Sequence, residues 1–162
     1  MLIFEGELMI SETEKQEIES VFKEYRFKQS ACIEALKIIQ KRRGWVSDED
    51  IKDISEFLGM TPDELDSVAT FYSLIFRREV GRHIVFICDS ASCWVMGYEK
   101  ILSYIKTKLG VAPGETSADG KFTLLPVACI GVCEQAPAMI IDNEVYGFLD
   151  EEKIDRILSA YE

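Results

Sequence analysis

The stretch HIVFICDSASCWVMGYEKILSYIKTKLG, residues 83–110, decides the fold of the C-terminal half of this chain. It begins with a short β-rich run over 83–88. After a loop, apolar residues recur at helical spacing: Ile101, Leu102, Ile105 and Leu109. A strand that continues through a short loop into an amphipathic helix is typical of α/β layers.

The segments after residue 110 extend this pattern. A turn-rich connection covers 111–121, and the runs FTLLPVAC (122–129), AMIID (138–142) and VYGFL (145–149) have strand composition. The last two are close enough to form a hairpin, and 150–161 has the pattern of a closing helix. The order β-α-β-β-β-α predicts an α/β layer fold with a mixed sheet over residues 81–162.

The first eighty residues carry helical signals instead. Ser11 with Glu14 has capping-box spacing, Gly44 and Gly59 are expected helix stops, and Thr61 precedes a proline at the first helical position. We therefore expect helices over 11–25, 29–44, 47–59 and 61–76, forming a four-helix bundle in residues 1–80. The predicted class is α+β, with the domain boundary at RREVGRH. Three aromatic residues beside the domain boundary are expected in the bundle core, with an interface as the alternative: Phe71, Tyr72 and Phe76.

Composition limits the function classes. The 162 residues are 48% hydrophobic, enough for a sizeable core, and 29 acidic against 18 basic side chains give a net charge of −11. No basic block could follow a nucleic-acid backbone, so nucleic acid is a poor partner. The N-terminus has no export-signal pattern, and no stretch approaches the ~18 apolar residues of a membrane span. Five cysteines without a signal indicate the reducing cytoplasm, where thiols bind metals or do redox chemistry.

Four of the cysteines form two pairs, each after a strand: Cys88, Cys93, Cys129 and Cys133. Gly131, inside the second pair, is expected at positive φ with its amide close to a sulfur. The single histidine, His83, excludes a Rieske site. The C-x₄-C and C-x₃-C spacings favour a four-cysteine metal centre, with iron–sulfur ahead of zinc, and leave a thiol–disulfide enzyme as the third alternative. Cys32 lies on an apolar helix face and is expected to be a core residue.

The complete pattern resembles a known family, the thioredoxin-like [2Fe–2S] ferredoxin subunits of respiratory complex I, the E subunits of bacterial NADH–quinone oxidoreductase. The resemblance runs from about 33 to 158 and rests on four ordered segments together with a four-helix region ahead of the cluster domain. The segments are EALKIIQKRRGWV, VATFYSLIFRREVGRH, CDSASCWVMGYEKI and APGETSADGKFTLLPVACIGVCEQAPAMIIDNEVYG. It implies a thioredoxin-like fold for residues 81–162 and the role of cluster ligand for Cys88, Cys93, Cys129 and Cys133. It also implies that Pro137 faces the metal loop.

The resemblance further implies a division of labour. This chain would hold one [2Fe–2S] cluster and exchange single electrons, while FMN and the NADH site belong to a partner subunit, with no activity expected from the isolated chain. The assembly would be an oxidoreductase and translocase, peripheral at the inner face of the cell membrane. Alternatives are the equivalent subunit of an NAD-dependent hydrogenase or formate dehydrogenase, and a zinc-stabilised binding module. The helical bundle and the segment FRREVGRH are expected to contact the flavin subunit. The basic group of this segment, at Arg77, Arg78 and Arg82, has solvated surface charge beside the linker as its alternative role.

Overall fold

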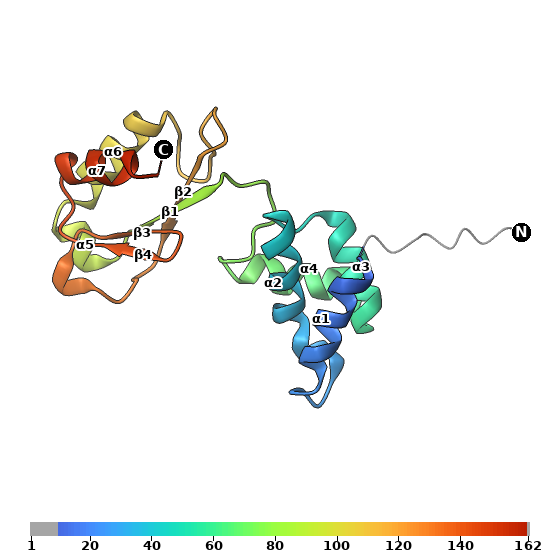
Figure 1. Ribbon diagram of the computed structural model, residues 1–162. Coiled ribbons are helices and arrows are strands. Elements are labelled where there is room, and N and C mark those ends of the chain that lie inside the picture. Colours follow the sequence, from blue (N-terminus) through green and yellow to red (C-terminus); the bar gives the residue numbers. More distant parts are fainter. Residues whose placement is uncertain (1–9, 162) are drawn as a thin grey trace, which may run out of the picture. The chain divides into compact units, whose positions relative to one another are not determined.

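The computed structural model describes residues 10–161, which divide between Glu79 and Val80 into a helical unit and a sheet unit (Figure 1). Residues 1–9, on which the prediction of no export signal partly rests, lie outside the described residues. Within 10–161, no helix is both long enough and apolar enough to cross a membrane. Each unit has its own buried apolar cluster.

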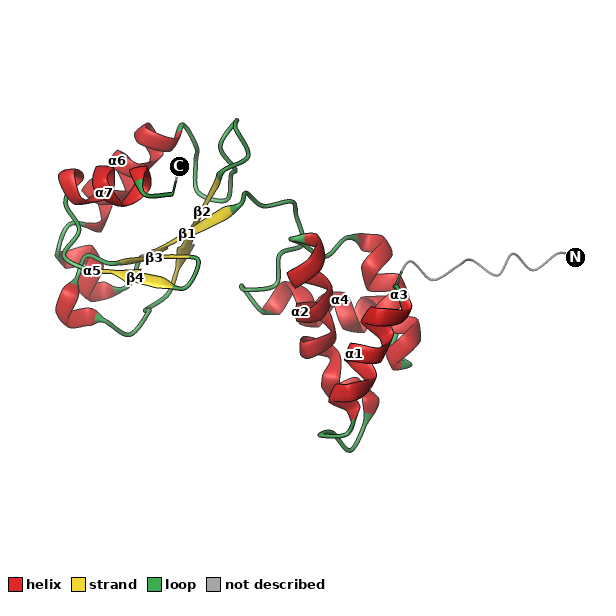
Figure 2. Cartoon of the chain, viewed as in Figure 1, coloured by secondary structure: helices red, strands yellow, loops and turns green. Residues whose placement is uncertain are grey.

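The helical unit consists of α1 (Glu12–Phe22), α2 (Cys32–Arg43), α3 (Asp48–Leu58) and α4 (Pro62–Phe71), with a 3₁₀ turn, η1 (Lys28–Ala31), ahead of α2 (Figure 2). Capping boxes begin three of the helices, at Ser11, Ser47 and Thr61. The glycines after α2 and α3 have positive φ, 85° at Gly44 and 68° at Gly59. The capping box at Ser11 and both glycine stops confirm the sequence predictions.

The buried core of the helical unit is aliphatic. Two of the aromatic residues that were expected there are exposed instead. Helix α4 ends at Phe71, and Tyr72 turns into extended backbone with φ −89° and ψ 107°. Phe71 is still within α4 but lies off the face that buries Leu65 and Ala69, and it is 80% exposed. The helical period ends at Tyr72, which is 43% exposed, while Ile75 is buried. The core prediction for Phe71 and Tyr72 was wrong. Cys32 is partly buried and packs against the core cluster, as expected.

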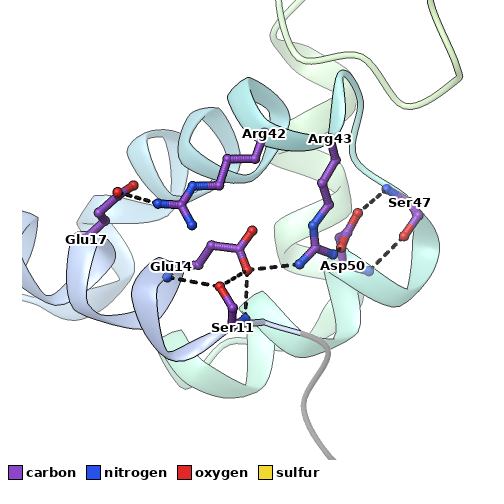
Figure 3. A network of polar contacts seen from close by, with 7 residues as sticks. All are labelled: Ser11, Glu14, Glu17, Arg42, Arg43, Ser47 and Asp50. Carbon is purple, nitrogen blue, oxygen red and sulfur yellow. Dashed lines mark hydrogen bonds and ion pairs between the residues drawn. The ribbon is translucent and has the colours of Figure 1, made fainter.

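Arg43, at the end of α2, joins two helix N-termini (Figure 3). Its guanidinium donates to Glu14 Oε2 at 3.0 Å and also pairs with Asp50. Glu14 and Asp50 are the carboxylates of the capping boxes of α1 and α3, and their side chains are only 5% and 3% exposed. Two carboxylates that close local caps thus also share one cation, which ties α1, α2 and α3 together.

The sheet unit contains strands β1 (His83–Cys88), β2 (Phe122–Val127), β3 (Met139–Ile141) and β4 (Glu144–Tyr146) in the order β2-β1-β3-β4. Strand β1 runs parallel to β2 and antiparallel to β3, which is antiparallel to β4, so the predicted mixed sheet is confirmed. Helices α5 (Ala91–Val95), α6 (Tyr98–Leu109) and α7 (Glu151–Ser159) complete the unit. The five-residue α5 was not predicted, because it is too short to show an apolar period.

The core of the sheet unit lies between the sheet and a pair of helices, α6 and α7, which lie side by side (Figure 1). Alternate residues of β1, Val85 and Ile87, point to this face and pack with the fully buried Ile105 of α6 and Ile154 of α7. At about 1.5–3 kcal/mol for each large buried aliphatic side chain, this cluster holds the strand ends in place. The loops that leave those strand ends carry the cysteines.

Candidate metal centre

The two cysteine loops leave the sheet at one edge. Cys88 is the last residue of β1 and pairs with Val127, the last residue of the parallel strand β2. Cys129 follows two residues later, and Cys133 begins a 3₁₀ turn, η2 (Cys133–Gln135). Since the carboxyl ends of adjacent parallel strands lie together, residues about forty positions apart in the sequence reach the same edge of the sheet.

The first pair, Cys88 and Cys93, is buried and anchored by backbone. Each is 2% exposed, and they pack with Ala136 and Ala138. The Cys88 N–H donates to the Ala138 carbonyl at 3.1 Å, while the Ala138 N–H donates to the Cys93 sulfur. A hydrogen bond also joins the Cys93 and Cys88 side chains. Cys93 lies within α5, whose extended N-cap residue is Ser90.

The second pair, Cys129 and Cys133, is exposed. Their sulfur atoms are 3.4 Å apart, and the Gly131 N–H donates to Cys129 Sγ at 3.4 Å. Gly131 has φ 89°, a conformation that side chains disfavour. This confirms the prediction that Gly131 turns its amide toward a sulfur. The hydroxyl of Ser92, on α5, makes a hydrogen bond with the Cys133 thiol and links the two loops.

The thiols influence one another's protonation. Burial, followed by the hydrogen bond with Cys88, raises the pKa of Cys93 to about 11. The Gly131 N–H and the Cys133 thiol lower the pKa of Cys129, and the resulting hydrogen bond and negative charge raise the pKa of Cys133. Cys93 and Cys133 therefore resist becoming thiolates unless a cation compensates the charge, which is the usual linkage between metal binding and proton release.

Pro137 lies between two residues that pack against the first pair. The Ala136–Pro137 peptide bond is cis. Ala136 and Ala138, on either side of the proline, both belong to the small cluster around Cys88 and Cys93. This segment therefore closes one wall of the site.

Sequence reasoning missed three parts of the site: α5, the hydroxyl of Ser92 and the backbone of Ala138. A serine cap ahead of a short segment, at Ser90, was a weak signal for α5. The contribution of Ala138 had no local signal, since it comes from β-sheet register. The end of α5 also carries a run of exposed apolar side chains: Trp94, Val95 and Met96, which are 59%, 74% and 60% exposed.

The donor set fits a [2Fe–2S] cluster. Such clusters are held by four cysteine thiolates, and amide N–H groups near the sulfurs tune them. The structure places four thiols as two pairs, with Gly131 and Ala138 supplying N–H groups to one sulfur of each pair. The thiols lie in twos, since no group of three or more His, Cys, Asp or Glu side chains within residues 10–161 could hold a single metal ion.

Comparison with known proteins adds a family to this geometry. A profile of the family described as thioredoxin-like [2Fe–2S] ferredoxin matches residues 18–162. The chain is 46% identical to the E subunit of NADH-quinone oxidoreductase of Pseudomonas aeruginosa over 160 residues, 99% of this chain and 96% of that one. It is 44% identical to the E subunit of the same enzyme from Escherichia coli over 152 residues, 94% of this chain and 92% of that one.

A solved structure shows the same fold in another context. An NAD⁺-reducing [NiFe]-hydrogenase in the air-oxidized state superposes with a TM-score of 0.67 at 22% identity. The likeness covers 78% of this chain and 22% of the hydrogenase chain, so this chain spans under a quarter of that protein. At this identity the likeness concerns the fold alone.

Proposed function

The chain belongs to the thioredoxin-like [2Fe–2S] ferredoxin family, and from that premise we propose that it is the electron-transfer subunit of an NADH–quinone oxidoreductase, with one [2Fe–2S] cluster. One observation carries the proposal within the chain: two thiol pairs lie on the loops that leave the carboxyl ends of adjacent parallel strands. When bound, the cluster supplies one-electron transfer. The proposed ligands are Cys88, Cys93, Cys129 and Cys133.

The chain's own residues determine how the site holds an electron. Gly131 and Ala138 donate N–H groups to sulfur, which stabilises negative charge there. Cys88 and Cys93 are screened from water by Ala136 and Ala138, whereas Cys129 and Cys133 face solvent. An electron can therefore enter or leave on the exposed side, at the second loop.

The choice among assemblies follows from the degree of similarity. The relatives that match nearly the whole chain at 44–46% identity are named as the E subunit of NADH-quinone oxidoreductase. The likeness to the hydrogenase is at 22% identity and concerns the fold. We therefore favour NADH–quinone oxidoreductase over a hydrogenase or formate dehydrogenase, with FMN and NADH bound by a partner subunit and the assembly peripheral at the inner face of the cell membrane.

Docking of the flavin subunit is proposed on two exposed apolar surfaces, one on each unit. The division of labour we propose is a docking four-helix bundle in 1–80 and a cluster domain in 81–162. On the helical unit, the exposed side chains follow the end of α4: Phe71, Tyr72 and Leu74. On the sheet unit, the exposed side chains are Trp94, Val95 and Met96. Val95 and Met96 line a hollow with Cys133, on the exposed side where a redox partner would approach.

Arg77, expected in a basic docking group, is engaged within the helical unit. It donates to Asp66 at 2.8 Å and Asp48 at 2.6 Å, and also to the Val46 carbonyl. Its side chain is 17% exposed. The charge of Arg77 therefore helps to hold the end of the helical unit in place, and the docking proposal moves to the apolar side chains.

Metal analysis and spectroscopy of the full chain test the cluster. After anaerobic loading with iron and sulfide, we expect two irons per chain, visible absorption, and a low-temperature EPR signal on one-electron reduction. Cys93→Ser and Cys129→Ser should lose these, and Cys32→Ser, a matched control on α2, should keep them. A colourless, EPR-silent chain with one zinc would replace this proposal with the zinc-stabilised module.

Co-purification with the flavin subunit tests the docking surfaces. Phe71→Asp and Trp94→Asp should each reduce the amount of flavin subunit recovered with the tagged chain, because each buries a charge in an apolar contact. Phe27→Asp is the control, since Phe27 is 60% exposed but the Arg26 guanidinium covers its ring. Equal recovery with all three variants would contradict the assigned surfaces.

A further inference from the structure

The two cysteine pairs differ in their access to solvent while both bring sulfur atoms together. Cys88 and Cys93 are each 2% exposed and sit beneath Ala136 and Ala138. Cys129 and Cys133 are exposed, with their sulfur atoms 3.4 Å apart. A dissolved reagent can therefore reach the second pair and is excluded from the first.

The second loop also has the freedom to bring its sulfur atoms into bonding distance. A disulfide needs the sulfur atoms at about 2.05 Å, so they must approach by roughly 1.4 Å, a distance that rotation of exposed side chains can cover. Gly131, between the two cysteines, has φ 89°, and apart from its chain neighbours no atom lies within 4 Å of the position that a Cβ would take. Nothing in the described surroundings of Gly131 opposes a small adjustment of the loop.

We propose that, in the chain without its cluster, Cys129 and Cys133 are a redox-modification site that a low-molecular-weight disulfide of the glutathione type converts into an intramolecular disulfide. The buried pair stays reduced. A further part rests on the function proposed above: the disulfide prevents cluster loading, because two of the four ligands are consumed, and a thiol reductant restores it.

The exchange balances without any other reactant. A Cys129 thiolate attacks one sulfur of the reagent RSSR, which forms a Cys129–SR mixed disulfide and releases RS⁻. Cys133 then attacks the Cys129 sulfur, forms the Cys129–Cys133 bond and displaces the second RS⁻. Two electrons pass from the protein sulfurs to the reagent, and the two thiol protons end on two molecules of RSH. Reversal by excess RSH regenerates both thiols.

Peptide mass analysis distinguishes the two pairs. The apo full chain is treated with oxidised glutathione under native conditions and then denatured, so that every free thiol can be alkylated. It is cut with trypsin after Arg82, Lys100, Lys121 and Lys153. Residues 83–100 and 122–153 then each carry one pair. We expect the 122–153 peptide to escape alkylation and to be lighter by two hydrogen atoms, while 83–100 carries two alkyl groups. Oxidation of 83–100 first, or alkylation of all four thiols, would overturn the proposal.

Two variants and a loading assay complete the test. Cys133→Ser should trap the glutathione adduct on Cys129, since the second attack is lost, whereas Cys32→Ser should behave as the unmodified chain. Oxidised apo-chain should take up no iron and sulfide until a thiol reductant is added; loading equal to that of reduced chain would refute the blocking role. If the reduced chain also fails to load, the proposed function fails, while the peptide masses still decide whether the disulfide forms.

Discussion

The helical unit and the sheet unit both bury polar side chains, but in the part of the chain that the structure describes only the helical unit provides them with a charged partner. Glu14 and Asp50 are buried carboxylates with complete internal partners, namely capping backbone and serine groups together with Arg43. Cys88 and Cys93 are buried thiols without a described cationic partner. They form hydrogen bonds with each other and with the backbone of Ala138. A buried group that is neutralised inside the fold supports stability, whereas one that is not supplies a binding site.

We expect the largest loss of stability when the shared cation of the helical unit is removed. Arg43→Met keeps the apolar stem but leaves two buried carboxylates without their cation, and we expect it to lower the free energy of unfolding by about 3 kcal/mol. Urea unfolding in a Trp94→Phe background measures it, since Trp45, between α2 and α3, is then the remaining tryptophan.

Arg42→Met is the matched control for this prediction. Arg42 pairs with Glu17 on the surface, where the side chains are 34% and 49% exposed, and surface pairs contribute about 0–1 kcal/mol. An equal decrease in the free energy of unfolding for the two arginine variants would mean that the buried network of Figure 3 stabilises the fold no more than a surface ion pair.

Acid should also lower the free energy of unfolding through this network, but by less than Arg43→Met does. Burial alone raises the pKa of Glu14, but hydrogen bonds from Ser11 and the charge of Arg43 outweigh it and hold the pKa below its ordinary value. A depressed folded-state pKa contributes stability above the unfolded-state value, and this contribution is lost as pH falls through the folded-state pKa. Urea midpoints should therefore drop between pH 6 and pH 3, and less steeply in Glu14→Gln. An identical slope in the variant would remove Glu14 as a cause.

The smallest effect is expected for a buried thiol. Cys93→Ala in the apo-chain removes a small side chain that behaves as a weakly polar hydrophobe, and we expect a loss of about 1 kcal/mol. Hydrogen exchange of the β1 amides measures the local stability. A decrease in stability as large as that of Arg43→Met would mean that Cys93 contributes as much to the stability of the fold as Arg43 does, which would contradict this prediction.

Much of the local structure could be predicted because its causes are local. The capping pattern Ser11 to Glu14, the stops at Gly44 and Gly59, and the Gly131 turn toward sulfur all involve residues within a few positions of each other. The aromatic residues after α4 were misplaced because apolar composition continued past the point where the backbone left the helix at Tyr72. Composition cannot show such an end when no glycine or proline marks it.

By itself, the sequence determined the α+β class, the order of elements, the mixed sheet and the two cysteine pairs, since hydrophobic period, capping chemistry and spacing are properties of short segments. The tertiary structure alone decided that Arg43 serves two caps, that Ala138 supplies both a carbonyl and an N–H to the first pair, and that one pair is buried while the other is exposed. These depend on helix packing and on strand register between distant segments. Solvent access, which separates the two pairs chemically, exists only once those segments have been brought together.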